Sequence, residues 1–341
     1  MKSGMSVLEK RKTGVVAMKK FILPLLAVCT LGAAEVATSW NKVFESGNLN
    51  DSVKWRTRVT VGEKDGQKFI QIGKTPQNAG KDFGFNLQQV PVEPNTLYKL
   101  VITAEVEGSD TVEDPKVVEA LRMGSANKRK IGKPLPGWII MYINDKDRHY
   151  ASEMPTWSCF CRKGKYEYVH LFYTPASARA VIVKCHNYGN LTNVVKFYKF
   201  TLEKVEGNVR NVNPDFAAGA YNCSGYSYGG KLWRIVEENG KALLKCNDSW
   251  VMGDPVPVKP GEKYTLTATG SKFGSRAATA SVLFLEGNSP FKGKRSKGVL
   301  VFSKADFETK SFQFTVPEGV SRLRPSLSRG NFSEVKLTLE Q

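Results

Sequence analysis

The chain has 341 residues and a formal charge of +18, and its length fits two domains of about 150 residues each. The first 34 residues hold six Lys or Arg and one Glu, so they carry +5 and leave +13 on the remainder. A basic protein favours anionic partners such as acidic or sulfated polysaccharide, an anionic cell envelope or nucleic acid. No nucleic-acid-binding module is recognisable, so we expect no nucleic-acid partner.

Residues 18–34 have the order of a secretory signal, with a basic start, a short apolar stretch and small residues at the exit. We expect cleavage after Ala34, and Met18 is an alternative start of the chain. A lipoprotein signal at Cys29 is disfavoured because a bulky Val precedes that residue. No other stretch is long and apolar enough for a transmembrane segment. The sequence therefore predicts a protein that is secreted, periplasmic or located at the cell surface.

Two parts of the chain resemble each other in the same order. The run V-P-V-E-P-N-T-L-Y at 90–98 returns as V-P-V-K-P-G-E-K-Y at 256–264. Four shorter matches accompany it: F-E-S-G (44–47) with F-A-A-G (216–219), G-Q-K-F-I-Q-I (66–72) with G-K-A-L-L-K-C (240–246), F-Y-T-P (172–175) with F-T-V-P (314–317), and F-T-L-E (200–203) with L-T-L-E (337–340). The offset falls from 166 to 142 along the chain, so the first copy carries 24 extra residues. A repeat of this length is a duplicated domain rather than a solenoid unit.

Short apolar or alternating runs between turn residues predict strands throughout both copies. The expected strands are 67–72, 97–106, 137–143, 166–174, 179–185, 194–205, 231–236, 241–246, 262–269, 279–286, 309–316, 320–327 and 333–340. We therefore predict an all-β protein with two tandem β-sandwich (jelly-roll) domains. The first would span 38–207 with an insertion at 108–136, and the second would span 208–341. Within the insertion, Asp114-Pro115 and a later Gly predict one short helix.

The run N-P-D-F-A-A-G at 213–219, followed by Trp233, the Pro-rich turn and a closing V-K-L-T-L-E, resembles carbohydrate-binding modules of families 4, 9 and 22. The first copy carries F-E-S-G and Trp55 in the matching places. The resemblance covers nearly all of the chain after the signal, and it implies a jelly roll that binds carbohydrate. It also implies a structural calcium near the first strand. Pro214 departs from the family pattern and the first copy lacks the Asn-Asp pair, so we expect no cofactor and leave structural calcium open.

The alternation of side chains along a strand separates its core side from its outer side. One set of positions on the strands 179–185 and 321–327 is apolar in both copies and should face the core: Val181, Val183 and Cys185, with Leu323, Pro325 and Leu327. The other set should face a groove or solvent: Ala180, Ile182, Lys184 and His186, with Arg322, Arg324, Ser326 and Ser328. The same rule turns His170 inward, beside Phe172, which predicts a hydrogen-bonded core histidine.

Carbohydrate recognition needs flat apolar side chains for the C–H face of a sugar and polar groups for its hydroxyls. We expect Trp138 and Tyr142 on one strand face with Ile140. We expect the other aromatic candidates, Tyr150, Trp157 and Trp250, in loops. The alternative for Trp138 and Tyr142 is ordinary core packing. The candidate ligand-binding residues are Trp138, Tyr142, Tyr150, Trp157, Lys184, His186, Trp250, Gln313, Arg322 and Arg324.

Arg322 and Arg324 alternate on one strand, so their guanidinium groups should point the same way, about 7 Å apart. Such a pair suits carboxylate or sulfate groups along a polymer. The alternative is a pairing with local acids such as Glu308 or Glu334, which would contribute little.

One of the six cysteines lies in the signal, and an odd number of five remains. Cys223 and Cys246 are the two cysteines of the second copy, and a disulfide between them is one possibility. Cys159, Cys161 and Cys185 precede His186, but the usual zinc spacing Cys-x-x-Cys is absent. The sequence therefore leaves the pairing and any metal open.

The sequence favours binding without catalysis, with a polysaccharide or glycan as partner and a monomeric chain. Some polysaccharide lyases use Tyr, His and Arg in a jelly-roll groove, and His149, Tyr150, Lys184 and His186 are candidates for such roles. No motif joins these residues, and the second copy has no His. Neither the paired carboxylates of glycosidases nor a Gly-x-Ser-x-Gly elbow is recognisable. A third alternative is a structural or adhesive envelope protein in which the sandwiches are spacers.

Overall fold

The structure, a computed structural model, describes most of the chain after the predicted signal. The described residues are 38–73, 83–107, 137–144, 157–187, 193–218, 226–229, 233–246, 249–287, 289–292 and 296–340. The signal, the insertion at 108–136 with its expected helix, and the candidates His149 and Tyr150 lie outside them. Within the described residues, no helix has the length and apolar character needed to cross a bilayer.

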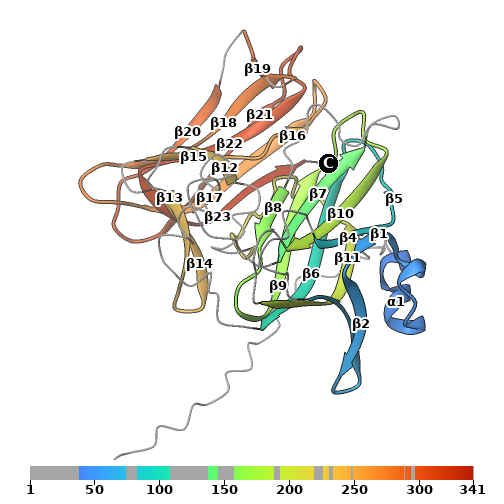
Figure 1. Cartoon of the computed structure of the whole chain (residues 1–341). Coiled ribbons are helices and arrows are strands. Elements are labelled where there is room, and N and C mark those ends of the chain that lie inside the picture. Colours follow the sequence, from blue (N-terminus) through green and yellow to red (C-terminus); the bar gives the residue numbers. More distant parts are fainter. Residues whose placement is uncertain are drawn as a thin grey trace, which may run out of the picture. The chain divides into compact units, whose positions relative to one another are not determined.

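The first half of the chain forms two antiparallel sheets after a short helical entry (Figure 1). The entry consists of η1 (Thr38–Asn41), α1 (Lys42–Ser46) and η2 (Leu49–Asp51). A six-stranded sheet has the order β1-β4-β10-β7-β8, with β5 also paired to β10, and a five-stranded sheet has the order β2-β3-β11-β6-β9. The strands are β1 (Val53–Thr57), β2 (Val59–Lys64), β3 (Gln67–Ile72), β4 (Phe83–Leu87), β5 (Val90–Pro91), β6 (Leu97–Glu107), β7 (Trp138–Asn144), β8 (Trp157–Phe160), β9 (Gly164–Tyr173), β10 (Ala180–Asn187) and β11 (Val194–Lys204).

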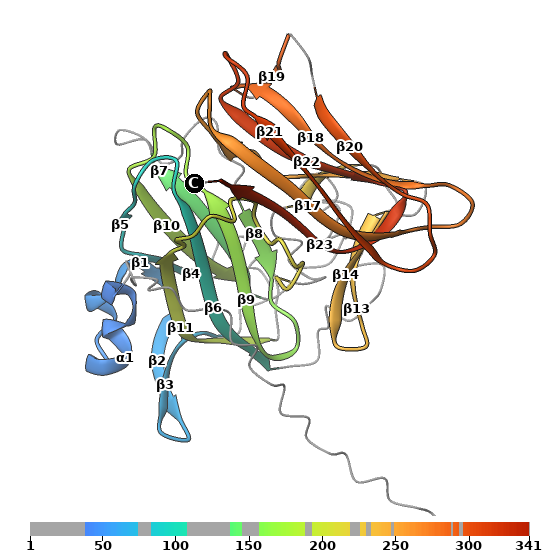
Figure 2. The same ribbon diagram turned by 180° about the vertical axis from the view of Figure 1, so that it is seen from behind.

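The second half repeats this arrangement (Figure 2). A seven-stranded sheet has the order β12-β15-β22-β18-β19, with β16 also paired to β22 and β20 to β18, and a five-stranded sheet has the order β13-β14-β23-β17-β21. The strands are β12 (Tyr226–Gly229), β13 (Trp233–Glu238), β14 (Lys241–Cys246), β15 (Trp250–Gly253), β16 (Val256–Pro257), β17 (Lys263–Lys272), β18 (Ala278–Glu286), β19 (Ser289–Pro290), β20 (Ser296–Phe302), β21 (Glu308–Thr315), β22 (Arg322–Ser328) and β23 (Gly330–Leu339). The strand order is the same in both halves, as the internal sequence repeat predicts.

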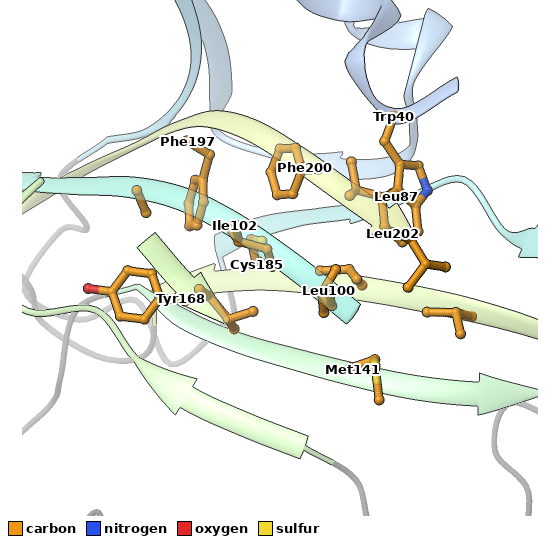
Figure 3. Packing of buried hydrophobic residues seen from close by; sticks show 14 of the residues in the cluster. Trp40, Leu87, Leu100, Ile102, Met141, Tyr168, Cys185, Phe197, Phe200 and Leu202 are labelled. Atoms are coloured by element: carbon orange, nitrogen blue, oxygen red, sulfur yellow. The ribbon is translucent and has the colours of Figure 1, made fainter. Parts of the chain in front are cut away.

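Each pair of sheets encloses its own apolar core. In the first half, Leu100 and Ile102 of the five-stranded sheet share a buried cluster with Met141 and Cys185 of the six-stranded sheet (Figure 3). A second cluster joins the two sheets of the other half, with Leu266 from one and Leu323 from the other. The prediction of an all-β protein with two β-sandwiches is confirmed. The exact domain boundaries stay a prediction.

The repeat extends to individual side chains at the Pro-rich turn. Tyr98 and Tyr264 are both buried, and their rings stack on Phe172 and Phe314 with centroids 6.1 Å apart in each case. The Tyr98 hydroxyl accepts a hydrogen bond from the backbone N–H of the turn, at 2.9 Å. The Tyr264 hydroxyl instead donates to Glu262, at 3.0 Å, and that carboxylate accepts the equivalent turn N–H. Each tyrosine therefore ties its turn to its own core.

The predicted core faces of the two aligned strands are also confirmed. All six positions expected to face inward are buried: Val181, Val183, Cys185, Leu323, Pro325 and Leu327. His170 is buried as well, with its ring stacked between Trp157 at 4.6 Å and Phe172 at 5.3 Å. Burial lowers the pKa of His170 to about 3, so this side chain is a neutral part of the core.

Candidate functional site

Four of the first-half candidates lie together on the outer face of the six-stranded sheet. In the register of β10 with β7, His186 lies opposite Trp138, and Ile182 lies opposite Tyr142. Lys184 lies between these rows, on the side of the sheet away from the buried Val183 and Cys185. The alternation that fills the core therefore also assembles this outer face.

Lys184 and Tyr142 contact each other on this face. The Lys184 ammonium lies 4.6 Å from the centroid of the Tyr142 ring, which is a cation–π distance. On the other side of β10, Asn86 of β4 lies opposite Lys184. Its side-chain oxygen is buried and has no hydrogen-bond partner among the described residues. An aromatic ring, a cation and an acceptor thus lie on one face.

The first outer face is largely closed to solvent. Ile140 is 5% exposed, and Ile182 and His186 are each 8% exposed. Trp138, Tyr142 and Lys184 are half-buried. Of these six described residues, Trp138, Tyr142 and Lys184 are therefore the ones that a ligand can reach.

Two aromatic candidates occupy different positions from those expected. Trp157 begins β8 instead of lying in a loop, and it is buried in the core against His170. It is therefore withdrawn as a ligand-binding residue. Trp250 also lies in a strand rather than a loop, but its side chain is 40% exposed.

The outer face of the seven-stranded sheet is open and carries a strip of hydroxyl groups. In one row across the sheet, Trp250 lies opposite Ser328, which lies opposite Thr279, which lies opposite Val301. The next row contains Met252, Ser326, Ser281 and Val299 in the same order. The flanking Val301 and Val299 are 45% and 57% exposed. The hydroxyls of Thr279 and Ser328 are 2.7 Å apart and hydrogen-bonded.

Arg322 and Arg324 extend this strip along the same strand. Both are half-buried and lie on the outer side of β22, because Leu323 and Leu327 fill the core. The acids proposed as their alternative partners, Glu308 and Glu334, belong to the five-stranded sheet. There Glu308 pairs with Lys310 at 3.2 Å, and Glu334 pairs with Lys336 at 2.6 Å.

Gln313 does not belong to this face. It lies on β21 opposite Thr265, in the five-stranded sheet of the same half, and is exposed there. The prediction that Gln313 shares a site with the two arginines is wrong, because β21 pairs with β17 and not with β22.

The cysteines do not assemble a metal site within the described part of the chain, where no group of three or more His, Cys, Asp or Glu side chains is placed to hold a metal ion. Cys185 faces the core and His186 faces outward, so the two adjacent side chains diverge. Burial raises the pKa of Cys161 and of Cys185. Cys246 is a buried free thiol, and Cys223, its possible disulfide partner by sequence, lies outside the described residues.

No protein-family model and no curated protein sequence matches the chain. Among solved structures, a tandem pair of family 22 carbohydrate-binding modules from Paenibacillus barcinonensis is similar, at 11% identity and a TM-score of 0.29, over 85% of this chain and 92% of that one. A family 16 carbohydrate-binding module has 16% identity and a TM-score of 0.31, over 50% and 99%. An allantoicase has 10% identity and a TM-score of 0.26, over 90% and 99%. All these TM-scores are below 0.5, so the similarities support no conclusion about function.

Proposed function

We propose that the protein is a non-catalytic polysaccharide-binding protein that uses the outer faces of its larger sheets. The open face of the second sandwich carries this proposal. It combines an exposed indole, Trp250, with the hydroxyl strip of Ser326, Ser328, Thr279 and Ser281. A sugar ring has an apolar C–H face and a rim of hydroxyls, and these are the complementary groups.

The first sandwich supplies a second, narrower contact. Tyr142 presents a ring next to the Lys184 ammonium, and Trp138 is half-exposed two rows away on the same face. The basic charge of the chain favours acidic polymers over neutral ones. The proposed location, secreted or at the cell surface, rests on the signal-like residues 18–34 alone.

Trp250→Ala is expected to weaken retention of the purified chain on its polysaccharide about tenfold, because buried aromatic contacts dominate many binding energies. The measurement is affinity electrophoresis over a panel of neutral and acidic polysaccharides. Phe307→Ala is the matched control, since Phe307 is an exposed aromatic residue in the turn between β20 and β21. Failure of the wild-type chain to bind any polymer would favour a spacer role for the sandwiches.

The alternative hypothesis, a polysaccharide lyase, predicts a different result with the same panel of polysaccharides. His170 is neutral and buried, so it has no access to a substrate from either outer face. The three histidines of the chain all precede the second half, so a histidine-based lyase would act at the first sandwich. We expect no rise in ultraviolet absorbance from unsaturated sugar ends when alginate, pectin or sulfated polymers are incubated with the protein. A steady rise in this absorbance that His186→Ala abolishes would contradict non-catalytic binding and support the lyase hypothesis.

A further inference from the structure

The two outer faces are not chemical copies of each other, although their strands are equivalent. Ala180 lies opposite Pro91 of the first Pro-rich turn, and Arg322 lies opposite Pro257 of the second. This equivalence fixes the rest of the register along β10 and β22. Ile182 then corresponds to Arg324, and the polar Lys184 and His186 correspond to Ser326 and Ser328.

The second sandwich therefore carries guanidinium groups where the first carries aliphatic side chains. Arg322 and Arg324 are two residues apart on one strand, so their Cα atoms lie about 7 Å apart on the same face. On the neighbouring strand β18, Leu285 lies opposite Arg322 and Leu283 lies opposite Arg324. Leu283 is half-buried and Leu285 is buried, so the side of each arginine toward β18 is apolar, and a charge interacts more strongly with an anion beside apolar groups than in water.

Asp254 lies between β15 and β16, and both of these strands pair with β22. An ion pair with one arginine would leave most of the donors in place. Each guanidinium has five N–H donors and a single carboxylate takes two, so the pair of side chains keeps donors for a ligand.

We propose that Arg322 and Arg324 make the second sandwich a site for anionic polysaccharide, with the sulfate or carboxylate groups of the polymer held by the two guanidiniums. This inference rests on the proposed function and names the substrate class for one of its two faces. The row Arg322, Arg324, Ser326 and Ser328 runs along β22 for about 20 Å, taking six strand rises. It ends beside Trp250, so a polymer can lie along it with anionic groups at one end and a ring against the indole at the other.

The test compares one polymer backbone with and without charge. The full chain is expected to be retained on dextran sulfate or carboxymethyl dextran more strongly than on neutral dextran. Replacing both residues, Arg322→Ala with Arg324→Ala, should reduce retention on the charged polymers at least tenfold in low salt and leave the unfolding midpoint nearly unchanged. Comparing the sulfate and carboxymethyl forms shows which anionic group the pair prefers.

Two control variants separate a specific site from general charge. Lys241→Ala with Lys263→Ala removes the same two charges from exposed positions in the five-stranded sheet, and it should lower retention less than threefold. Arg322→Lys with Arg324→Lys keeps the charge but removes the planar fork, so it should lose most of the retention, because a lysine ammonium cannot make the bidentate contact. If Arg322→Ala with Arg324→Ala and Lys241→Ala with Lys263→Ala lose the same amount of retention, the proposed site is overturned while polysaccharide binding remains intact. Binding to no polymer at all would overturn the proposed function itself.

Discussion

Replacing His170 by Phe is expected to make the first sandwich markedly less sensitive to acid. Burial holds the pKa of His170 at about 3 in the folded chain, against 6.5 for an ordinary histidine. The unfolded chain therefore binds a proton between pH 6.5 and 3 that the folded chain does not, so stability falls as the pH drops through this window. The loss approaches about 1.4 kcal/mol per pH unit. Above pH 7 the histidine is neutral in both the folded and the unfolded chain, so this loss of stability does not occur.

The measurement is the free energy of unfolding of the full chain at pH 7 and at pH 4.5. Between these values the wild-type chain should lose about 2–3 kcal/mol more than His170→Phe, which corresponds to two pH units below 6.5. Phe is the residue at the equivalent position 312 of the second copy, so the substitution has a precedent in this fold. His170→Leu provides a second non-titrating variant if Phe overpacks the stack with Trp157.

Phe172→Leu is the control for this experiment, because it disturbs the same ring stack without removing a titrating group. It should lower stability at pH 7 and keep the acid sensitivity of the wild type. If His170→Phe and the wild type lose the same free energy between the two pH values, His170 is not the neutral core residue that its burial indicates.

The sequence predicts strands best where one side of the strand fills a core, because the apolar residues then alternate with polar ones. The run of alternating apolar residues at 97–106, for example, forms the long central strand Leu97–Glu107. Several edge strands are missing from the sequence prediction, because an edge pairs on one side only and needs no continuous apolar set. Val53–Thr57, Tyr226–Gly229 and Ser296–Phe302 are of this kind.

The errors in the candidate site have two physical causes. Trp157, Cys159 and Cys161 are spaced by two and are all buried, so the period-two pattern of W-S-C-F-C indicates that these three side chains face the core. Gln313 illustrates the other cause. Alternation correctly turned it away from the core, but it cannot tell which of two stacked sheets a strand joins. That choice depends on strand pairing between segments far apart in the sequence.

Alternation also cannot tell whether an outer face is open. Alternation assigns Ile182 to a groove or solvent side, and Trp250 is expected in a loop, yet Ile182 is 8% exposed and Trp250, on the outer face of its strand, is 40% exposed. The difference between a closed first face and an open second face arises from tertiary packing. It moves the strongest part of the candidate site from the aromatic residues of the first copy to Trp250 and the two arginines.

The segment 208–212 behaves as part of the second sandwich. The backbone N–H of Leu339 donates to Asn208, and that of Arg210 donates to Leu337, each at 2.8 Å. Asn211 is 3% exposed, and its side chain donates to the carbonyl of Val335 and accepts from the N–H of Leu337, both at 2.6 Å. In the first sandwich Asn41 binds the backbone of Phe200 in the same two-bond manner, at 2.7 and 3.1 Å. In each sandwich a side-chain amide thus forms two hydrogen bonds to the backbone of the last strand.

The fragment 208–341 is therefore expected to unfold cooperatively by itself, and the shorter fragment 213–341 to be less stable by about 3–5 kcal/mol. The shorter fragment loses two backbone hydrogen bonds and both Asn211 bonds, and it leaves acceptors and donors of β23 unpaired. In 208–341, Asn211→Ala alone should cost about 2–3 kcal/mol, whereas Asn208→Ala should cost little because only its backbone is used. Urea denaturation followed by tryptophan fluorescence measures all four proteins. Equal midpoints for 208–341 and 213–341 would show that the second sandwich begins after the segment, and absence of a cooperative transition in 208–341 would show that it needs the first.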